Sequence, residues 1–267
     1  MKKTAISIVV VAVVVVLIIG DVQGWLFQWE EEESIMVYSG AGMREPMDEI
    51  GQVFQKKYGT EVKYNYAGSQ ALLSQMELTK VGDAYMPGET MYIEIAWEKG
   101  LTGYQRLVCY HIPVIAVPKG NPANITCLED LARPGVTLIF GNPDVAAIGR
   151  TAKEILERNG LYEAAWANVV ATLPTMNEVM VHIAVGQAQA SINWWDTVKA
   201  AENIEVVEIP REQNSIEIIP IGVTTFTKYP ETARRFVDFC VSGEGKAIFE
   251  KYGFIGYPNP EYGEYEE

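Results

Sequence analysis

The sequence contains few of the residues on which metal sites, disulfide frameworks and nucleic-acid surfaces depend. Its 267 residues include 3 cysteines and 2 histidines, and 21 Lys plus Arg stand against 35 Asp plus Glu, for a net charge of -14. Three widely separated cysteines without CxxC spacing predict neither a disulfide framework nor a zinc or redox motif, although one bridge stays open. An acidic chain lacks the electrostatic footprint for phosphate backbones or anionic lipid, so we expect no nucleic-acid partner.

Sequence signatures of common enzymes are also missing. The chain has no GxxxxGK[ST] loop, GxSxG elbow, HExxH helix or GxGxxG turn. His111 lies in an apolar strand pattern and His182 in an apolar helix pattern, which predicts packed or rim side chains rather than bases or metal ligands. We therefore expect a binding protein that is not an enzyme, with no cofactor and no ligands for a free cation.

The composition that remains is that of a folded protein. Hydrophobic residues make up 48% of the chain and charged residues 21%, which is ordinary globular usage. The length suggests one large domain or two lobes. Because no internal repeat or long linker separates two halves, a second lobe would have to be inserted into the first.

A basic and then apolar segment opens the chain. Lys2 and Lys3 precede an unbroken apolar run from Ala5 to Gly20, which is typical of an export signal. As a helix this run spans about 24 Å, less than the ~30 Å hydrocarbon core of a bilayer. We expect residues 1–24 to be a cleaved signal peptide, with a permanent membrane anchor as the alternative, and residues 25–34 to be an acidic spacer. The rest is then periplasmic or at the cell surface.

From Ile35 onward short strand patterns alternate with helical periodicity. This alternation predicts an α/β fold with largely parallel sheets. The expected strands are 35–39, 61–66, 107–117, 136–140, 190–194, 204–209 and 216–225, and the expected helices include 150–159, 162–171, 177–185, 231–241 and 245–252. One further helix follows Met43 and ends at Gly59, and another begins at Ser69.

Three Gly- and Ser-rich turns lie between a predicted strand and a predicted helix. They are Ser39-Gly40-Ala41-Gly42, Ala67-Gly68-Ser69-Gln70 and Gly141 to Gly149. In each turn glycine allows a close approach to a ligand, and the first turn of the next helix presents unpaired N–H groups. Any single turn is explained as well by an N-cap and a tight turn. Together the three predict a cradle for a small oxyanion, to which Ser39 and Ser69 add neutral hydroxyl donors.

Several short motifs occur in the same order as in a known family. They are Ser39 to Met43, Gly68-Ser69-Gln70-Ala71-Leu72, Val117 to Pro122, Leu128 to Leu131, Gly141-Asn142-Pro143 and Tyr252-Gly253-Phe254. In these motifs the chain resembles the molybdate-binding periplasmic proteins of ABC importers, over about residues 35 to 257. The resemblance implies a bilobal periplasmic-binding-protein fold of type II, in which crossover strands join two α/β lobes with mixed sheets.

On this resemblance residues 35–113 and 222–267 form lobe one and residues 114–221 form lobe two, with crossings near Pro113 and Gly222. The implied function is capture of molybdate or tungstate between the lobes by a monomer, which delivers the anion to the permease subunit of an ABC transporter in the membrane. One alternative is a binding protein for sulfate, phosphate or an organic anion. An enzyme on the same bilobal fold is less favoured, and a membrane-tethered sensor domain is the least favoured.

The resemblance also implies a set of ligand-binding positions and some departures from them. The positions are Ser39, Gly42, Ser69, Ala147, Ile148, Glu178, Val179 and Trp194. Gly42 stands where the family commonly has serine, and Trp194 where it has tyrosine; the Trp194-Trp195 pair is otherwise explained by core packing. Archaeal relatives that complete a six-coordinate metal carry carboxylates where this chain has Ala146 and Asn193. We therefore expect a tetrahedral oxyanion held by neutral donors. The segment Gly82 to Glu89 departs from the family pattern and has no expected role.

Overall fold

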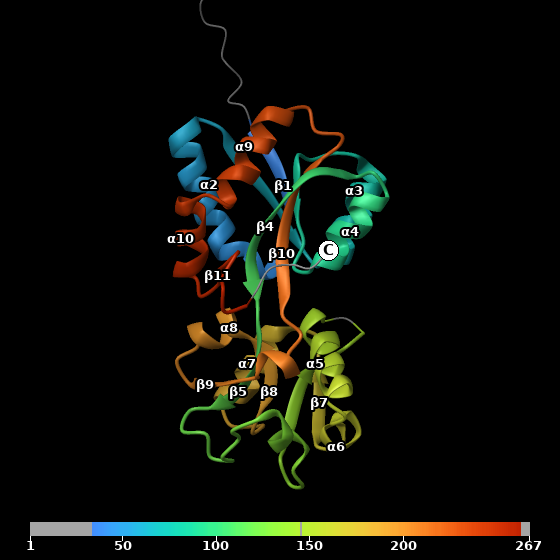
Figure 1. The fold of residues 1–267 in the computed structure, drawn as a ribbon, viewed down its shortest axis with the longest axis vertical. Coiled ribbons are helices and arrows are strands. Elements are labelled where there is room, and N and C mark those ends of the chain that lie inside the picture. The colour runs from blue at the N-terminus through green and yellow to red at the C-terminus, as the bar shows by residue number, and fades with distance from the viewer. Residues whose placement is uncertain (1–33, 145, 263–267) are drawn as a thin grey trace, which may run out of the picture.

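The computed structural model describes residues 34–144 and 146–262, which form two α/β halves arranged end to end (Figure 1). The six-strand half contains residues 34–111 and 217–262, and the three-strand half contains residues 113–214. We keep these two names below. The mixed α/β architecture agrees with the expected fold class.

The six-strand half is built on a sheet with the strand order β11-β4-β10-β3-β1-β2. β1 pairs in parallel with β2 and β3, whereas β10 runs antiparallel to β3 and β4. The strands are β1 (Ser34–Gly40), β2 (Glu61–Ala67), β3 (Ala84–Met86), β4 (Thr102–His111), β10 (Glu217–Thr224) and β11 (Ile255–Gly256). The helices are η1 (Ala41–Met43), α2 (Arg44–Tyr58), α3 (Ser69–Thr79), α4 (Thr90–Glu98), α9 (Pro230–Cys240) and α10 (Gly243–Lys251).

The three-strand half contains a sheet of order β8-β5-β9 and a parallel pair β6-β7. A bridge between Leu138 and Ala190 connects the two. The strands are β5 (Pro113–Pro118), β6 (Leu138–Gly141), β7 (Val169–Leu173), β8 (Ser191–Trp194) and β9 (Ile204–Glu208). The helices are η2 (Leu128–Ala132), α5 (Ala147–Arg158), α6 (Tyr162–Trp166), α7 (Met176–Ala184), α8 (Trp195–Ala200) and η3 (Arg211–Gln213).

Side-chain alternation along β1 divides the core of the six-strand half between two layers of helices. Ile35 and Val37 pack with α2, α9 and α10, where Phe54 and Phe236 meet edge to face at 5.1 Å. Tyr38 points the other way and packs with α3 and α4, as the period of two in a strand requires. Helices therefore cover both faces of the sheet (Figure 1), and between them β3 is fully buried and β1 is buried except at Ser34 and Met36.

The chain crosses between the halves twice, and the two crossing segments lie side by side. β4 passes directly into β5, and Asn214 Nδ2 on the returning segment donates to the Pro113 carbonyl oxygen at 2.9 Å. Glu217 is already the register partner of His111, so the chain has rejoined the six-strand sheet before Gly222, where we expected the crossing. Gly222 is instead a strand glycine: a Cβ there would lie 3.0 Å from Ile93 Cδ1 and 3.1 Å from Gln105 Cγ.

Other elements differ from the sequence-based expectations. The expected strand 107–117 is two strands in different sheets, β4 and β5, because the chain changes halves at Ile112. The expected helix 162–171 ends at Trp166, and the β-branched residues that follow form β7. The sheets are mixed rather than largely parallel, because β4 and β10 run in opposite directions between the halves. Cys109, Cys127 and Cys240 are all free thiols, so the bridge left open does not form.

The expected signal peptide or anchor lies outside the described residues, as does nearly all of the expected acidic spacer. Within residues 34–144 and 146–262, no helix combines the length and apolarity that crossing a bilayer requires.

Candidate functional site

Three turns of the six-strand half meet at the ends of its parallel strands. Ser39, near the end of β1, is the register partner of Met86 at the end of β3. A Cβ on Gly40 would lie 3.3 Å from the Gly88 nitrogen, so these two turns are in close approach. The Gly88 N–H in turn donates to Ser69 Oγ at 3.0 Å. The segment Gly82 to Glu89, which had no expected role, thus connects the first two predicted turns.

The two predicted serines differ in what their hydroxyls can offer. Ser69 Oγ accepts from Gly88, which leaves its own proton available to donate to a ligand. Ser39 is fully buried, and its hydroxyl contacts the Gly40 carbonyl oxygen at a long 3.5 Å. No side chain among the described residues caps α3, whose N-cap is Gly68. The start of α3 therefore presents its first N–H groups beside the Ser69 hydroxyl.

The third predicted turn lies in the three-strand half and precedes α5. A Cβ on Gly149 would come within 2.4 Å of the Gly141 carbonyl oxygen, so the loop folds back tightly on the first turn of the helix. Ala147 and Ile148 are the first two residues of α5, and Ile148 is buried. In the described part of the chain no side chain caps this helix. Like α3, α5 can direct its N–H groups and the positive end of its dipole at an anion.

The start of α7 is arranged differently. The Glu178 N–H donates to Thr175 Oγ1 at 3.3 Å, and Glu178 Oε2 accepts from the Thr175 N–H at 3.2 Å and from its hydroxyl at 2.9 Å. The Val179 N–H donates to the Thr175 carbonyl oxygen at 3.3 Å. In this arrangement both expected backbone donors, Glu178 and Val179, are used within the helix, and a carboxylate stands where a donor was expected. A ligand at this helix start would have to take the place of these bonds, and the role of Glu178 and Val179 remains an expectation.

Trp194 joins the two halves through His111. Trp194 ends β8, is 3% exposed, and belongs to the core of the three-strand half. Its indole stacks on the His111 imidazole, with ring centroids 3.6 Å apart and planes at 18°. These are the contacts of a packed core residue. The stack places His111, at the end of β4, in the contact between the halves.

His111 and Asp196 form a buried pair beside this stack. Burial lowers the pKa of His111 to about 3, although hydrogen bonding to the Gly88 backbone acts in the opposite direction. Burial also raises the pKa of Asp196 to about 6. His111 Nε2 lies 3.5 Å from Asp196 Oδ1, and at neutral pH this is a contact between a neutral imidazole and a carboxyl group. Sequence reasoning predicted a packed His111 but had no signal for its neighbours.

Gly42, the last residue of the first turn, lines a cavity between the halves. The cavity has a volume of about 580 Å³. It is lined by Ala41, Gly42, Arg44, Glu45, Pro46, Tyr252 and Phe254 from the six-strand half and by Thr175, Met176, Asn177, Asp196, Thr197 and Ala200 from the three-strand half. The structure therefore places Gly42 near the starts of α7 and α8, and Ser39 and Ser69 near Gly88.

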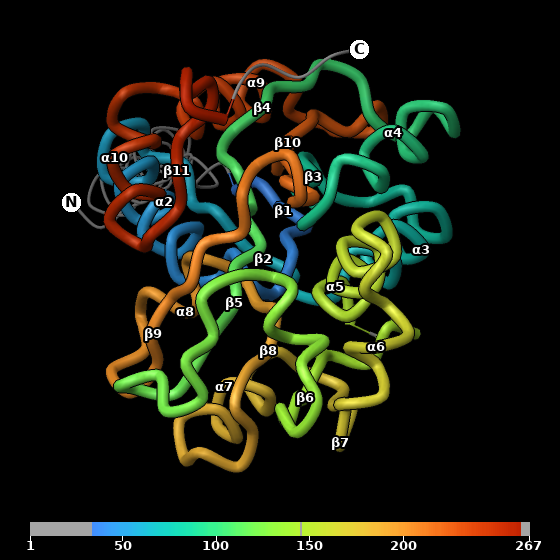
Figure 2. Tube along the Cα trace, turned by 60° about the horizontal axis from the view of Figure 1, so that its bottom comes forward, coloured from blue at the N-terminus to red at the C-terminus, as the bar shows by residue number. Residues whose placement is uncertain are grey.

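A charged contact crosses between the halves at the start of α5. Arg150 Nη2 lies 3.2 Å from both carboxylate oxygens of Glu89, and 3.5 Å from the Tyr92 hydroxyl. Both views place α5 in the three-strand half on the side of the molecule where α3 and α4 lie in the six-strand half (Figures 1 and 2). Sequence reasoning missed this pair, since a long-range contact leaves no local pattern. Glu89 is the N-cap residue of α4 and follows Gly88, the partner of Ser69, and Arg150 comes two residues after Ile148. The contact therefore links the first turn of α5 to the start of α3 through Gly88.

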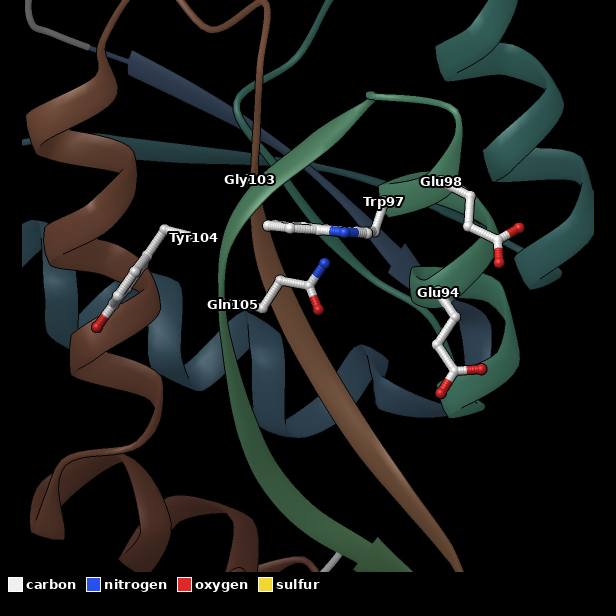
Figure 3. Close-up of a pocket in the computed structure, with 6 residues that line it drawn as sticks. All are labelled: Glu94, Trp97, Glu98, Gly103, Tyr104 and Gln105. Carbon is white, nitrogen blue, oxygen red and sulfur yellow. The ribbon is translucent and has the colours of Figure 1, made fainter. Parts of the chain in front are cut away.

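A second hollow lies on the outer face of the six-strand half, between α4 and β4 (Figure 3). The Trp97 indole, 58% exposed over the whole residue, lies across it, with Glu94 and Glu98 on the α4 side and Gln105 below. Tyr104 points away toward α9, where its hydroxyl donates to Asp238. Two carboxylates would repel an oxyanion, so this hollow is not the anion cradle. In the described ranges no group of three or more His, Cys, Asp or Glu side chains could hold a metal ion.

Comparison with known proteins gives one family and a consistent fold. The family described as bacterial extracellular solute-binding protein matches residues 35–255. The molybdate-binding protein ModA of Mycobacterium bovis is 26% identical over 224 residues, which cover 83% of this chain and 84% of that protein.

Solved structures share the architecture at lower identity. A substrate-binding domain from Clostridium difficile superposes with a TM-score of 0.73 at 20% identity, covering 83% of this chain and 98% of that one. The sulfate-binding protein SubI from Mycobacterium tuberculosis gives a TM-score of 0.72 at 16% identity, covering 86% and 89%. At these identities the structures support the fold alone.

Proposed function

The chain belongs to the family of bacterial extracellular solute-binding proteins, and from this premise we propose that it captures a tetrahedral oxyanion, molybdate or tungstate, between its two halves. The molybdate-binding relative supports the choice of anion. The observation that carries the proposal is that two uncapped helix starts, α3 and α5, are linked across the halves: Gly88 bonds to Ser69 at the start of α3, and its neighbour Glu89 contacts Arg150 in the first turn of α5. Neutral donors at these starts suit a dianion that needs hydrogen bonds rather than a counter-charge.

Within this proposal the donors are Ser69 and the N–H groups at the starts of α3 and α5, including Ala147 and Ile148. Ser39 supplies a second hydroxyl, and Gly42 allows the backbone of η1 to approach. Each hydrogen bond to a charged group contributes about 1.5–3 kcal/mol. Trp194 supports the site through its stack on His111, which contacts the Gly88 backbone.

We further propose that the two halves are the two lobes of the trap and that they close on the anion as rigid bodies. The pairing of Glu217 with His111 supports a boundary before Glu217, rather than at the expected 221/222. Residues 1–24 act as the export signal or as an anchor, and the loaded protein delivers its anion to the permease subunit of an ABC transporter as a monomer. Membership in an extracellular family supports this route.

One observation favours a larger anion as a second candidate ligand. The cavity beside Gly42 has a volume of about 580 Å³ and includes the cation Arg44, which lies there with the carboxyl groups of Glu45 and Asp196. A tetrahedral oxyanion would leave most of this volume empty, whereas an organic anion with a carboxylate or phosphate group would occupy it.

Titration calorimetry on the exported domain, with tungstate, molybdate, sulfate, phosphate and a small organic phosphate, tests the proposal. We expect one site per chain, with tungstate and molybdate bound at least about tenfold more tightly than sulfate, a difference of about 1.4 kcal/mol. A preference for the organic phosphate would favour the second candidate. No heat and no thermal stabilisation with any anion would contradict both.

A further inference from the structure

The contact between Arg150 and Glu89 joins two elements that are each held firmly by their own half. The start of α4 is fixed on the six-strand sheet, because the Thr90 hydroxyl donates to the Ile218 carbonyl oxygen at 2.7 Å and the Gly88 N–H donates to Ser69 Oγ. Arg150 belongs to the first turns of α5, in which the Thr151 hydroxyl bonds back to the Ala147 carbonyl oxygen at 3.2 Å. The pair therefore reports directly on the distance between the halves.

Because the Glu89 carboxylate is largely buried, its negative charge is stabilised by the nearby Arg150 guanidinium. The Glu89 side chain is 10% exposed, against 41% for Arg150. The negative charge of Glu89 also contributes to raising the pKa of Glu217 to about 7, after the larger effect of burial, and Glu154 and Glu94 act in the same direction. Without the guanidinium, the α4, α5 and β10 carboxylates would repel one another across the junction of the halves. Arg150 thus changes a repulsive junction into an attractive one.

The Arg150–Glu89 pair lies next to the proposed anion-binding groups at the starts of α3 and α5. Glu89 follows Gly88, the partner of Ser69, and Arg150 comes shortly after Ala147 and Ile148. Holding Arg150 on Glu89 holds the N–H groups of α5 opposite the donors of α3. Nη2 of the guanidinium contacts both Glu89 carboxylate oxygens, which fixes where the Arg150 side chain lies and suits a role in positioning.

We propose that the Arg150–Glu89 pair is a latch that holds the two halves together and thereby sets the rate at which the anion is released. Its effect on anion release depends on the proposed function, but its effect on the distance between the halves does not. Arg150 is then a positioning residue, and the latch acts on the closed state more than on the first encounter with the anion.

Four variants test the latch: Arg150→Gln, Glu89→Gln, the double variant, and Lys153→Gln as the matched control. Lys153 lies on the same helix, but it forms its ion pair with Glu157 of that helix, at 3.7 Å. Stopped-flow tungstate binding, followed by tryptophan fluorescence, is expected to show a dissociation rate about tenfold higher for each single variant, with association changed less than twofold. The double variant is expected to match the single ones, and Lys153→Gln to match the unmodified protein.

Two results would overturn the latch. If Glu89→Gln tightens binding while Arg150→Gln weakens it, Arg150 contacts the anion directly. If all the variants release tungstate at the rate of the unmodified protein, the Arg150–Glu89 pair does not hold the two halves together.

Small-angle X-ray scattering without ligand separates the latch from the proposed function. The latch predicts a larger radius of gyration for Arg150→Gln and Glu89→Gln than for Lys153→Gln, with unfolding temperatures confirming that each variant is folded. If the unmodified protein binds no oxyanion, the proposed function is wrong, but the scattering comparison still tests the latch. Equal radii of gyration for Arg150→Gln, Glu89→Gln and Lys153→Gln would contradict the latch.

Discussion

The helices α5 and α7 begin in the same half of the molecule, and sequence reasoning expected both to offer backbone donors. Their starts differ in one respect. α7 has a capping box in which Thr175 and Glu178 satisfy each other, whereas no described side chain caps α5. A helix start that satisfies its own N–H groups gains stability but has little left to offer a ligand. The comparison teaches that capping decides which helix start can serve as an anion site.

The largest expected effect comes from displacing the start of α5. In Gly149→Ala the new Cβ would lie 2.4 Å from the Gly141 carbonyl oxygen, so the turn must shift. We expect a loss of stability of about 1–3 kcal/mol and a tungstate affinity reduced about 100-fold, since two bonds to a charged group contribute about 3 kcal/mol. Thermal unfolding and calorimetry measure both. Gly243→Ala, at the start of α10, is the control, since no atom lies within 4 Å of its Cβ; an equal loss there would contradict the account.

Ser69→Ala tests the partner of α5 on the opposite half. It removes both the acceptor for the Gly88 N–H and the hydroxyl proposed to donate to the anion. We expect affinity for tungstate to fall about 10- to 100-fold, as for loss of about 1.5–3 kcal/mol. Ser74→Ala, on an exposed position of the same helix, should leave calorimetric affinity unchanged. Equal tungstate affinities of Ser69→Ala and Ser74→Ala would mean that Ser69 does not bind the anion.

The stability of the folded protein should also depend on pH through Glu217. Burial raises the pKa of its carboxyl group from 4.5 to about 7. A raised carboxyl pKa stabilises the folded state fully below the unfolded value and loses that contribution as pH rises to about 7. Glu217→Gln should therefore remove a pH-dependent loss on the order of 2 kcal/mol between pH 5 and pH 8. Chemical denaturation at the two pH values measures it. An unchanged pH dependence in Glu217→Gln would mean that Glu217 does not titrate in this range.

The smallest effect on binding is expected at the capped helix. Thr175→Ala removes both hydroxyl bonds of the capping box and should cost about 0.5–2 kcal/mol of stability. Tungstate affinity should change less than about threefold, that is, by less than about 0.7 kcal/mol. If calorimetry finds a loss like that of Ser69→Ala, the start of α7 belongs to the cradle after all.

The elements that strong local patterns specify could be predicted from the sequence. The alternation at Ile35 to Ser39, the helix that ends at Gly59 with a φ of 75° and the turns at Ser69 and Gly149 correspond to β1, α2, α3 and α5. β3 has three residues, Ala84–Met86, too few to show a period, so its role in placing Gly88 against Ser69 was not foreseen.

Only those features of the candidate site that depend on residues adjacent in the sequence could be predicted. Thr175-Met176-Asn177-Glu178 is a readable capping box, which predicts that the Glu178 N–H has a partner within its own helix. The pairs Arg150–Glu89 and His111–Trp194 are separated by 61 and 83 residues in the sequence and depend on how the halves meet. No local pattern specifies such contacts.

The most direct test of the account is anomalous diffraction at a tungsten absorption edge from crystals grown with tungstate. The account predicts one tungsten peak between the starts of α3 and α5, with oxygens within hydrogen-bond distance of Ser69 Oγ and of the first N–H groups of α5. A peak at the start of α7, beside Thr175 and Asp196, would contradict it.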